Sequence, residues 1–401
     1  MSSREASPAR LGTGPGRGWL GASLALAVVG AAGFLTALAG PDAHRAWQAY
    51  LANFLFWTGL SFGSVMFSAT LTMTKARWGR PLKRLAEAPS AFLPVAFVLF
   101  LALYPGRAEI LPWVLHPIPE RAQWLNTPAL FLRNALALLV LAGLGLAIVR
   151  CSVRRDAAGA ALPGDRASRG RGEAVLSPLY GMAYAVVLSL LAFDLVMSLD
   201  PHWFSTNLGA YYFVGSFYSG LAALLAVAAV AARSETLGPY IGGKELRDLA
   251  TLLFAFAVLT AYMFYVQLLT IWYGNVPHET EFLLRRLRAV PWRDVSWTVL
   301  ALAFGFPFLV LLNRPLKSRS LPMLVVAVVV LAGMWLERFL LVAPSLWTGK
   351  TAPLGWLEVL VTLGFLGLVG CCVTVFLRTF PLVPLSDPLL RELLESRREE
   401  G

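Results

Sequence analysis

Two carboxylates lie inside apolar stretches that are long enough to cross a lipid bilayer. Asp194 occurs within the stretch 176–204, and Glu337 lies in the sequence WLERFLLVAPSLW, which begins at residue 335. An ionisable side chain at the centre of a membrane helix costs up to about 3 kcal/mol on insertion scales, so it usually faces a protein interior or a wet cavity. The two acids therefore either lock helices together or lie on a path for protons or for a ligand.

Neighbouring charged residues are candidate partners for these carboxylates. Arg338 follows Glu337 directly, but adjacent residues of a helix point about 100° apart, so the two need not pair with each other. Arg133 lies about one turn into another apolar stretch, and Asp294 lies just before one. We expect Arg133 and Asp294 to be partners of the buried carboxylates across a helix bundle.

Further titratable residues could carry protons to either side of the membrane. His202 and His278 lie in or beside loops, where an imidazole that titrates near neutral pH can pass protons to water. Asp248 marks where a path from the opposite side could begin, although a solvated helix start explains this acid equally well. The candidates for proton transfer are Asp194, Glu337, Arg338, Arg133, His202, His278 and Asp248.

The sequence offers no ligand set for a metal or a haem. None of the four histidines lies at depth within an apolar stretch, whereas a membrane-embedded haem needs axial ligands that project inward from facing helices. Cys151, Cys371 and Cys372 form neither a CxxC pair nor a spacing suited to iron–sulfur ligation. We therefore assign no catalytic, cofactor-binding or metal-binding residue, and we expect any redox centre in a partner protein.

Composition predicts an all-α integral membrane protein. Of the 401 residues, 57% are hydrophobic and only 14% are charged, and the mean hydropathy is +0.65. No segment between the apolar stretches is long enough for a folded soluble domain. The formal net charge of +11 does not indicate nucleic-acid binding, because membrane proteins collect Lys and Arg in cytoplasmic loops for topological reasons.

Ten apolar stretches meet the length of about 20 residues that a transmembrane helix needs. They lie at 18–40, 47–73, 89–104, 127–149, 178–200, 207–232, 247–272, 295–313, 320–342 and 354–378. Lys and Arg are concentrated in the termini and in the loops after even-numbered stretches, so the positive-inside rule predicts that the tails 1–17 and 379–401 are cytoplasmic.

An internal repeat of four stretches organises the chain. Asp194 and Glu337 each lie seven residues before a proline that is followed closely by a tryptophan. Because four is an even number, the two copies enter the membrane in the same direction, unlike inverted repeats. The repeat predicts two parallel four-helix bundles, 45–204 and 205–350, with one flanking helix at each end, 18–40 and 354–378.

Small residues recur at matching places in the two copies. Gly59 and Gly63 in the first copy correspond to Gly215 and Ser219 in the second. Such spacing allows close helix approach in a membrane, and we expect it to act within each bundle.

Three loops carry further expectations. Residues 105–126 and 274–294 are long and rich in Trp and Pro, and the second holds four arginines on the predicted outer side. We expect both loops to be buried against partner subunits, although an amphipathic segment lying on the membrane also accommodates arginines. The loop 151–177 has no apolar periodicity, so we expect it to be mobile and dispensable.

Three segments carry a resemblance to a known family. The segments LAFDLVMSLDPHWFSTNLGAYYFVGSF, DLATLLFAFAVLTAYMFYVQLLTIWYGNVPHET and FPLVPLSDP resemble the second NrfD-like integral membrane subunit of alternative complex III, the ActF type. Both large membrane subunits of that quinol:cytochrome c oxidoreductase belong to the polysulfide-reductase membrane-subunit family. The similarity covers spans 2 to 9 and the tail, and its most specific parts are the exit of span 5 and the IWYGNVPHET turn.

The resemblance implies a subunit of a respiratory electron-transfer complex in the inner membrane of a bacterium. It implies that iron–sulfur clusters and haem c are carried by neighbouring subunits, beside a sister NrfD-like membrane subunit. This chain would then scaffold the complex and relay protons, without redox catalysis of its own, and quinol or quinone is a candidate ligand. A secondary transporter and a structural partner without proton conduction are the alternatives, but paired Gly/Pro-broken helices at matching places are missing from the sequence.

Overall fold

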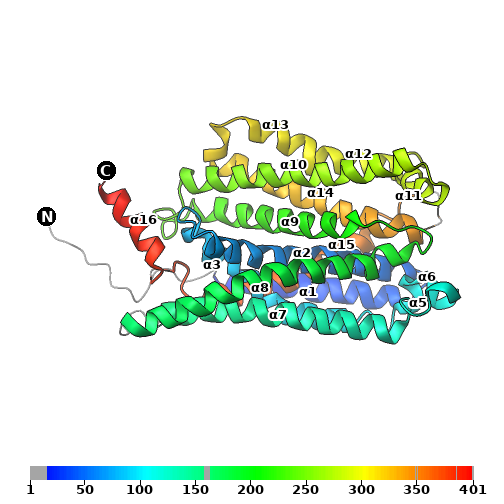
Figure 1. Ribbon diagram of the computed structural model, residues 1–401, viewed down its shortest axis with the longest axis horizontal. Helices are drawn as coiled ribbons and strands as arrows, with labels where there is room; N and C mark the ends of the chain where they lie inside the picture. The colour runs from blue at the N-terminus through cyan, green and yellow to red at the C-terminus, as the bar shows by residue number, and fades with distance from the viewer. Residues whose placement is uncertain (1–15, 158–162, 348, 350, 385, 400–401) are drawn as a thin grey trace.

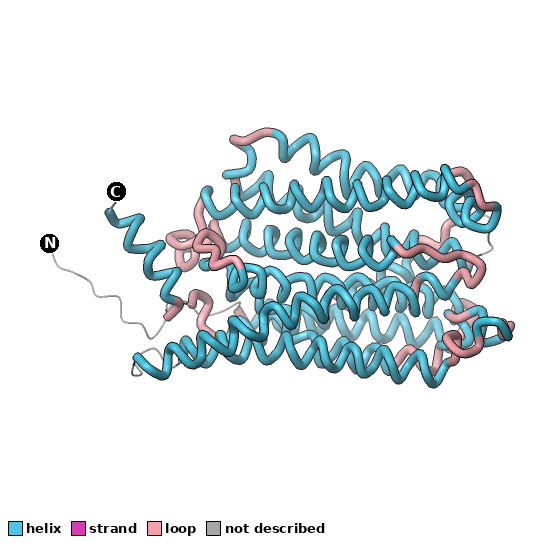
Figure 2. Tube along the Cα trace, viewed as in Figure 1, coloured by secondary structure: helices cyan, strands magenta, loops and turns pink. Residues whose placement is uncertain are grey.

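Helices form every regular element in the residues that the structure describes. The computed structural model describes residues 16–157, 163–347, 349, 351–384 and 386–399. Ten helical stretches in this part are long and apolar enough to span a membrane, which confirms the predicted fold class of an all-α, multi-pass membrane protein (Figure 2). The N-terminal tail predicted at 1–17 lies almost entirely outside the described residues.

Each spanning element overlaps one predicted stretch, but the third begins at 80 and not 89, the fourth ends at 157 and not 149, and the fifth begins at 163 and not 178. They are α1 (Arg17–Leu38), α2 (Ala43–Met73), a broken third span made of η1 (Arg80–Leu82), α3 (Lys83–Glu87), η2 (Ala88–Phe92) and α4 (Leu93–Leu101), then α7 (Thr127–Ala157), α8 (Pro163–Leu195), α9 (Asn207–Ala231), α10 (Gly243–Gly274), α12 (Trp292–Leu300) with η5 (Ala301–Gly305) and α13 (Phe306–Leu312), α14 (Ser320–Leu346) and α15 (Trp356–Thr379). Short helices lie outside the spans: α5 (Arg107–Ile110), α6 (Pro112–Leu115), η3 (Pro119–Arg121), η4 (Met197–Leu199), α11 (Pro277–Leu287), η6 (Leu316–Ser318) and α16 (Pro388–Glu399).

The long helices run side by side, with α2 and α9 at the centre of the molecule (Figure 1). On one side of this pair lie α4, α7 and α8, and on the other lie α10, α13 and α14. Helix α15 packs along α1, and an added Cβ on Gly30 would lie 2.2 Å from the Cα of Gly364. Both described chain ends lie at one end of the bundle with α3 and α16, and α5, α6 and α11 lie at the opposite end (Figure 1).

The glycines of α2 bring the two halves of the molecule together. A Cβ on Gly63 would lie 2.3 Å from the backbone oxygen of Ser216, and a Cβ on Gly220 would lie 2.6 Å from the carbonyl carbon of Gly63. The expectation that Gly59 and Gly63 act within one bundle is therefore wrong, because they mediate the α2–α9 contact between bundles. Gly215 does act within its own bundle, where it leaves room for Arg338.

Two prolines free backbone carbonyls that side chains then satisfy. Pro307 has no N–H for the carbonyl of Ala303, four residues earlier, and the hydroxyl of Tyr218 donates to that oxygen at 2.8 Å. The π-helical segment η5 lies at this place, as is common where the regular hydrogen-bond ladder is interrupted. Pro344 likewise frees the carbonyl of Leu340 inside α14.

The segment 151–177 is not the loop that its composition predicted. Residues 151–157 continue α7 and residues 163–177 begin α8, so most of the segment is helical; residues 158–162 lie outside the described part. Arg155 and Glu173 form a salt bridge of 3.0 Å in which their side chains are 10% and 2% exposed. Charged residues here are buried at the end of a bundle, which a pattern of apolar periodicity does not reveal.

Candidate functional site

Asp194 is held by a complete set of hydrogen-bond donors in the last turn of α8. Arg133 on α7 donates through Nε to Oδ2 and through Nη2 to Oδ1, both at 2.6 Å, which is a bidentate ion pair. Asn134 donates to Oδ2 at 2.5 Å, and the indole of Trp124 donates to Oδ1 at 3.0 Å. Each carboxylate oxygen therefore accepts two hydrogen bonds, and the carboxyl group is fully buried.

This environment suits a structural carboxylate. The four hydrogen bonds occupy both oxygens of Asp194 and link α8 to α7 and to the loop before it. The guanidinium of Arg133 also lies 4.2 Å from the centre of the Trp124 ring and donates to the Trp124 carbonyl at 2.9 Å. The expected pairing of Arg133 with a buried carboxylate is therefore found in the structure.

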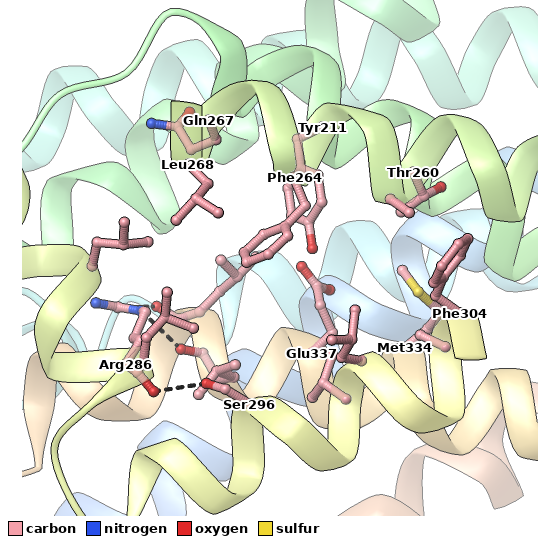
Figure 3. A pocket seen from close by; sticks show the side chains of 18 of the residues that line it. Tyr211, Thr260, Phe264, Gln267, Leu268, Arg286, Ser296, Phe304, Met334 and Glu337 are labelled. Atoms are coloured by element: carbon pink, nitrogen blue, oxygen red, sulfur yellow. Dashed lines mark hydrogen bonds between the residues drawn. The ribbon is translucent and has the colours of Figure 1, made fainter. Parts of the chain in front are cut away.

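Glu337 has a less complete set of partners. It lies on α14, 3% exposed, and Nη1 of Arg338 lies 2.9 Å from its Oε2. The two neighbours thus do pair, contrary to the argument from helical spacing, because both side chains extend along the same buried contact with α9. Oε2 receives no hydrogen bond of normal geometry from any described residue, and the hydroxyl of Tyr211 faces the carboxylate (Figure 3).

Arg338 keeps other contacts besides its pair with Glu337. Its Nη2 donates to the carbonyl of Tyr212 at 3.2 Å and to the hydroxyl of Ser216 at 3.4 Å. Its guanidinium lies 4.2 Å from the centre of the Tyr212 ring. These neutral acceptors and the ring hold the cation in place.

Glu337 lines a cavity of about 330 Å³ between α9, α10, α11, α12, η5 and α14 (Figure 3). Most of its wall is apolar, as in typical pockets for small organic ligands. The lining residues with side-chain donors or acceptors are Tyr211, Thr260, Gln267, Arg286, Ser296, Trp203, Trp297 and Glu337. The cavity therefore joins one carboxylate to a largely hydrocarbon space inside the second bundle.

Arg286 on α11 closes part of this cavity and caps the broken end of α14. Its Nε donates to the carbonyl of Leu340, which Pro344 had left without its helical donor, and Nη2 donates to the carbonyl of Leu341 and to Ser345. The guanidinium also lies 3.5 Å from the centre of the Phe282 ring, and Nη1 donates to the Phe282 carbonyl. Burial lowers the pKa of Arg286 to about 9, with Asp200 opposing that effect. One arginine of the segment 274–294 thus has a structural role.

The remaining candidates do not join either carboxylate. His202 and His278 are exposed, and Asp248 is half-buried at the far end of α10. Asp294 pairs with its exposed neighbour Arg293 at 3.0 Å, so the expectation that it contacts a buried carboxylate is wrong. Of the predicted candidates for proton transfer, the structure brings together two pairs. Asp194 lies beside Arg133 in one bundle, and Glu337 lies beside Arg338 in the other.

Sequence reasoning missed a buried ionic cluster in the first bundle, at the end of the molecule where both described chain ends lie. It consists of four bases and four acids whose side chains are at most 10% exposed: Arg80, Lys83, Arg84, Arg155, Glu87, Asp156, Glu173 and Asp387. Asp387 accepts from Arg80 and Arg155, each at 3.0 Å, and so attaches the segment before α16 to the bundle. The three bases and the one acid at 80–87 were the available signal, but a solvated helix start has the same pattern.

No group of three or more His, Cys, Asp or Glu residues that could hold a metal ion occurs in the described ranges. The three cysteines are free thiols of intermediate burial. One bundle thus contains a buried ion pair that joins two helices, and the other contains a carboxylate beside an apolar cavity.

Comparison with known proteins gives one family match. The profile of a family described as "Polysulphide reductase, NrfD" matches residues 40–349, which include both carboxylates and the cavity. No curated protein matches the chain significantly.

Proposed function

Because the chain belongs to the NrfD family of polysulphide reductase membrane proteins, we propose that it is the integral membrane subunit of a quinol:acceptor oxidoreductase of the alternative complex III type. In this role it spans the inner membrane of a bacterium with both termini in the cytoplasm. It scaffolds a sister membrane subunit, an iron–sulfur subunit and haem c subunits, and relays protons through an intramembrane carboxylate. The redox chemistry itself belongs to those partners.

The difference between the two repeat-related carboxylates is the observation that carries the proton-transfer part of the proposal. Asp194 accepts four hydrogen bonds and is enclosed, whereas Glu337 has one charged partner and lines a cavity. A group that exchanges protons needs a free lone pair and access to a donor or acceptor. Glu337 meets both conditions and Asp194 meets neither.

The residues around Glu337 support both protonation states. When the carboxylate is ionised, Arg338 compensates its charge at 2.9 Å. When it takes up a proton at Oε2, Arg338 retains the Tyr212 carbonyl, the Ser216 hydroxyl and the Tyr212 ring as partners. The Tyr211 hydroxyl, which faces the carboxylate, supplies a neighbouring site for hydrogen bonding on the cavity side (Figure 3).

The end of the molecule opposite the termini is the proposed docking side for the extracytoplasmic partners. Its two long loops, 105–126 and 274–294, contain the short helices α5, α6 and α11, and large aromatic side chains are exposed there: Trp124 in the first loop and Tyr273 at the end of α10, just before the second. Aromatic residues are enriched at protein interfaces and at membrane surfaces. In the assembled complex we expect both loops to be protected from proteolysis.

Purification from native membranes tests the assignment. A tagged chain extracted in mild detergent should bring haem c and iron–sulfur proteins with it and should support quinol oxidation. A chain that purifies alone from the same membranes, with no haem absorbance and no redox partner, contradicts the proposed complex.

A further inference from the structure

We propose that the cavity beside Glu337 binds one neutral amphiphile, whose head carries a hydroxyl or carbonyl group and whose tail is hydrocarbon. Two membrane components share this chemistry: a quinol or quinone, and a neutral diacyl lipid. The inference rests on the proposed function only for the first of these sources. The head contacts Glu337 and Tyr211, and the tail lies between α10 and α12.

The size and the lining of the cavity define the tail. A volume of about 330 Å³ is within the usual range of small-molecule pockets and accommodates a ring or a short section of a lipid chain. Phe264, Leu268 and Phe304 contribute apolar wall. The lining residues Trp297 and Leu300 are 63% and 38% exposed on the outside of α12, so a ligand can enter from the membrane.

The polar groups of the cavity define the head. Glu337 is nearly fully buried, and its Oε2 lacks a hydrogen bond of normal geometry within the described chain, so it can accept one from a hydroxyl. The Tyr211 hydroxyl can donate to a carbonyl or accept from a hydroxyl. An oxygen-bearing head of modest size therefore finds both kinds of partner.

The charges of the cavity exclude an anionic ligand. Glu337 repels a carboxylate or a phosphate, and its own countercharge, Arg338, is already engaged with Tyr212 and Ser216. Arg286, the cation among the lining residues, donates through Nε and both Nη atoms to backbone carbonyls and to Ser345. Fatty acids and phospholipid head groups thus lack a free cation to bind.

At the matching place in the first bundle, the carboxylate has other partners. There the carboxylate of Asp194 is covered by Arg133, Asn134 and Trp124. These three side chains occupy the space that a ligand head would need. The repeat thus has an acid in both halves, and Glu337 is the one that lines the cavity described here.

The experiment is ligand retention by the full-length chain purified in mild detergent, measured by native mass spectrometry after addition of decylubiquinone, dioleoylglycerol or oleate. Ala261 lines the cavity on α10, so Ala261→Leu and Ala261→Phe fill it by increasing amounts. Ala255→Phe makes the larger change on the exposed face of the same helix and serves as the control. Because the assay measures ligand bound to this chain, it gives a result even when no redox partner is present.

The wild-type chain should retain one neutral probe, with binding weakened in Ala261→Leu and at least tenfold in Ala261→Phe, and unchanged in Ala255→Phe. Retention of decylubiquinone but not dioleoylglycerol identifies the quinol pool as the source, and the reverse identifies a neutral lipid. The inference is overturned if the wild-type chain retains neither neutral probe, if oleate binds more tightly than both, or if folded Ala261 variants bind like the wild type.

Discussion

Replacement of Asp194 by asparagine should destabilise the chain without altering proton chemistry. Both carboxylate oxygens accept two hydrogen bonds, from Arg133 and Asn134 on one and from Arg133 and Trp124 on the other. An asparagine has a single acceptor oxygen, so in either orientation its NH₂ group faces two donors. The substitution also leaves the charge of Arg133 without its carboxylate.

The size of this effect follows from the burial of the pair. The side chains of Arg133 and Asp194 are 21% and 0% exposed, so solvent screens their interaction weakly. Breaking a buried, hydrogen-bonded ion pair costs about 3 kcal/mol at the lower end of measured values, which is roughly a 100-fold change in the folding equilibrium. After the substitution, Arg133 still contacts the carbonyl and the ring of Trp124. We therefore expect a loss of stability at the lower end of the measured values.

The assay is reversible unfolding in mixed micelles by sodium dodecyl sulfate, followed by far-ultraviolet circular dichroism. Asp294→Asn is the matched control, because the side chain of Asp294 is 66% exposed and pairs only with Arg293. We expect a clear shift of the midpoint for Asp194→Asn and none for Asp294→Asn. Equal midpoints for the two variants would refute the description of Asp194 as a structural lock.

Three further predictions concern helix contacts and caps. Gly63→Ala should lower the free energy of unfolding by about 2 kcal/mol, because the added Cβ would lie 2.3 Å from the Ser216 backbone oxygen. Gly143→Ala, whose Cβ would meet open space, should leave it unchanged, and the same unfolding assay compares the two. Arg286→Gln should lower the free energy of unfolding by about 2 kcal/mol, because it leaves the Leu340 carbonyl of α14 without a donor, and exposed Arg288→Gln should not, so equal stability of the two would contradict the capping role. Asp387→Asn should release α16, seen as faster proteolytic removal of the C-terminal residues than in the wild type; an unchanged rate would show that α16 is held by other contacts.

Hydropathy and the internal repeat were enough to predict most of the architecture. The ten spans and the all-helical class follow from the length of the apolar stretches, because a bilayer requires the backbone hydrogen bonds of a helix. The seven-residue interval to a proline identified Asp194 and Glu337 as related, and both are buried. The same interval did not reveal that α8 ends directly after Asp194 whereas α14 continues through Pro344 to Leu346.

The features that were missed depend on contacts between distant parts of the chain. Asp387 meets Arg80 and Arg155 across more than two hundred residues, so local patterns cannot show that these charges are buried. The pairing of Glu337 with Arg338 depends on how α14 packs against α9, where Gly215 makes room for the guanidinium. The cavity likewise arises from packing around η5 and α11.

Quinol oxidation and proton release per assembled complex test the central claim, that Glu337 exchanges protons while Asp194 stabilises the fold. The measurement compares Glu337→Gln with Asp194→Asn after normalising each to its haem content. Glu337→Gln should lower proton release at least tenfold in intact complexes, because glutamine keeps the shape but has no exchangeable carboxyl proton, and Asp194→Asn should change it less than twofold. Wild-type proton release in Glu337→Gln, or a larger loss in Asp194→Asn, would contradict the account.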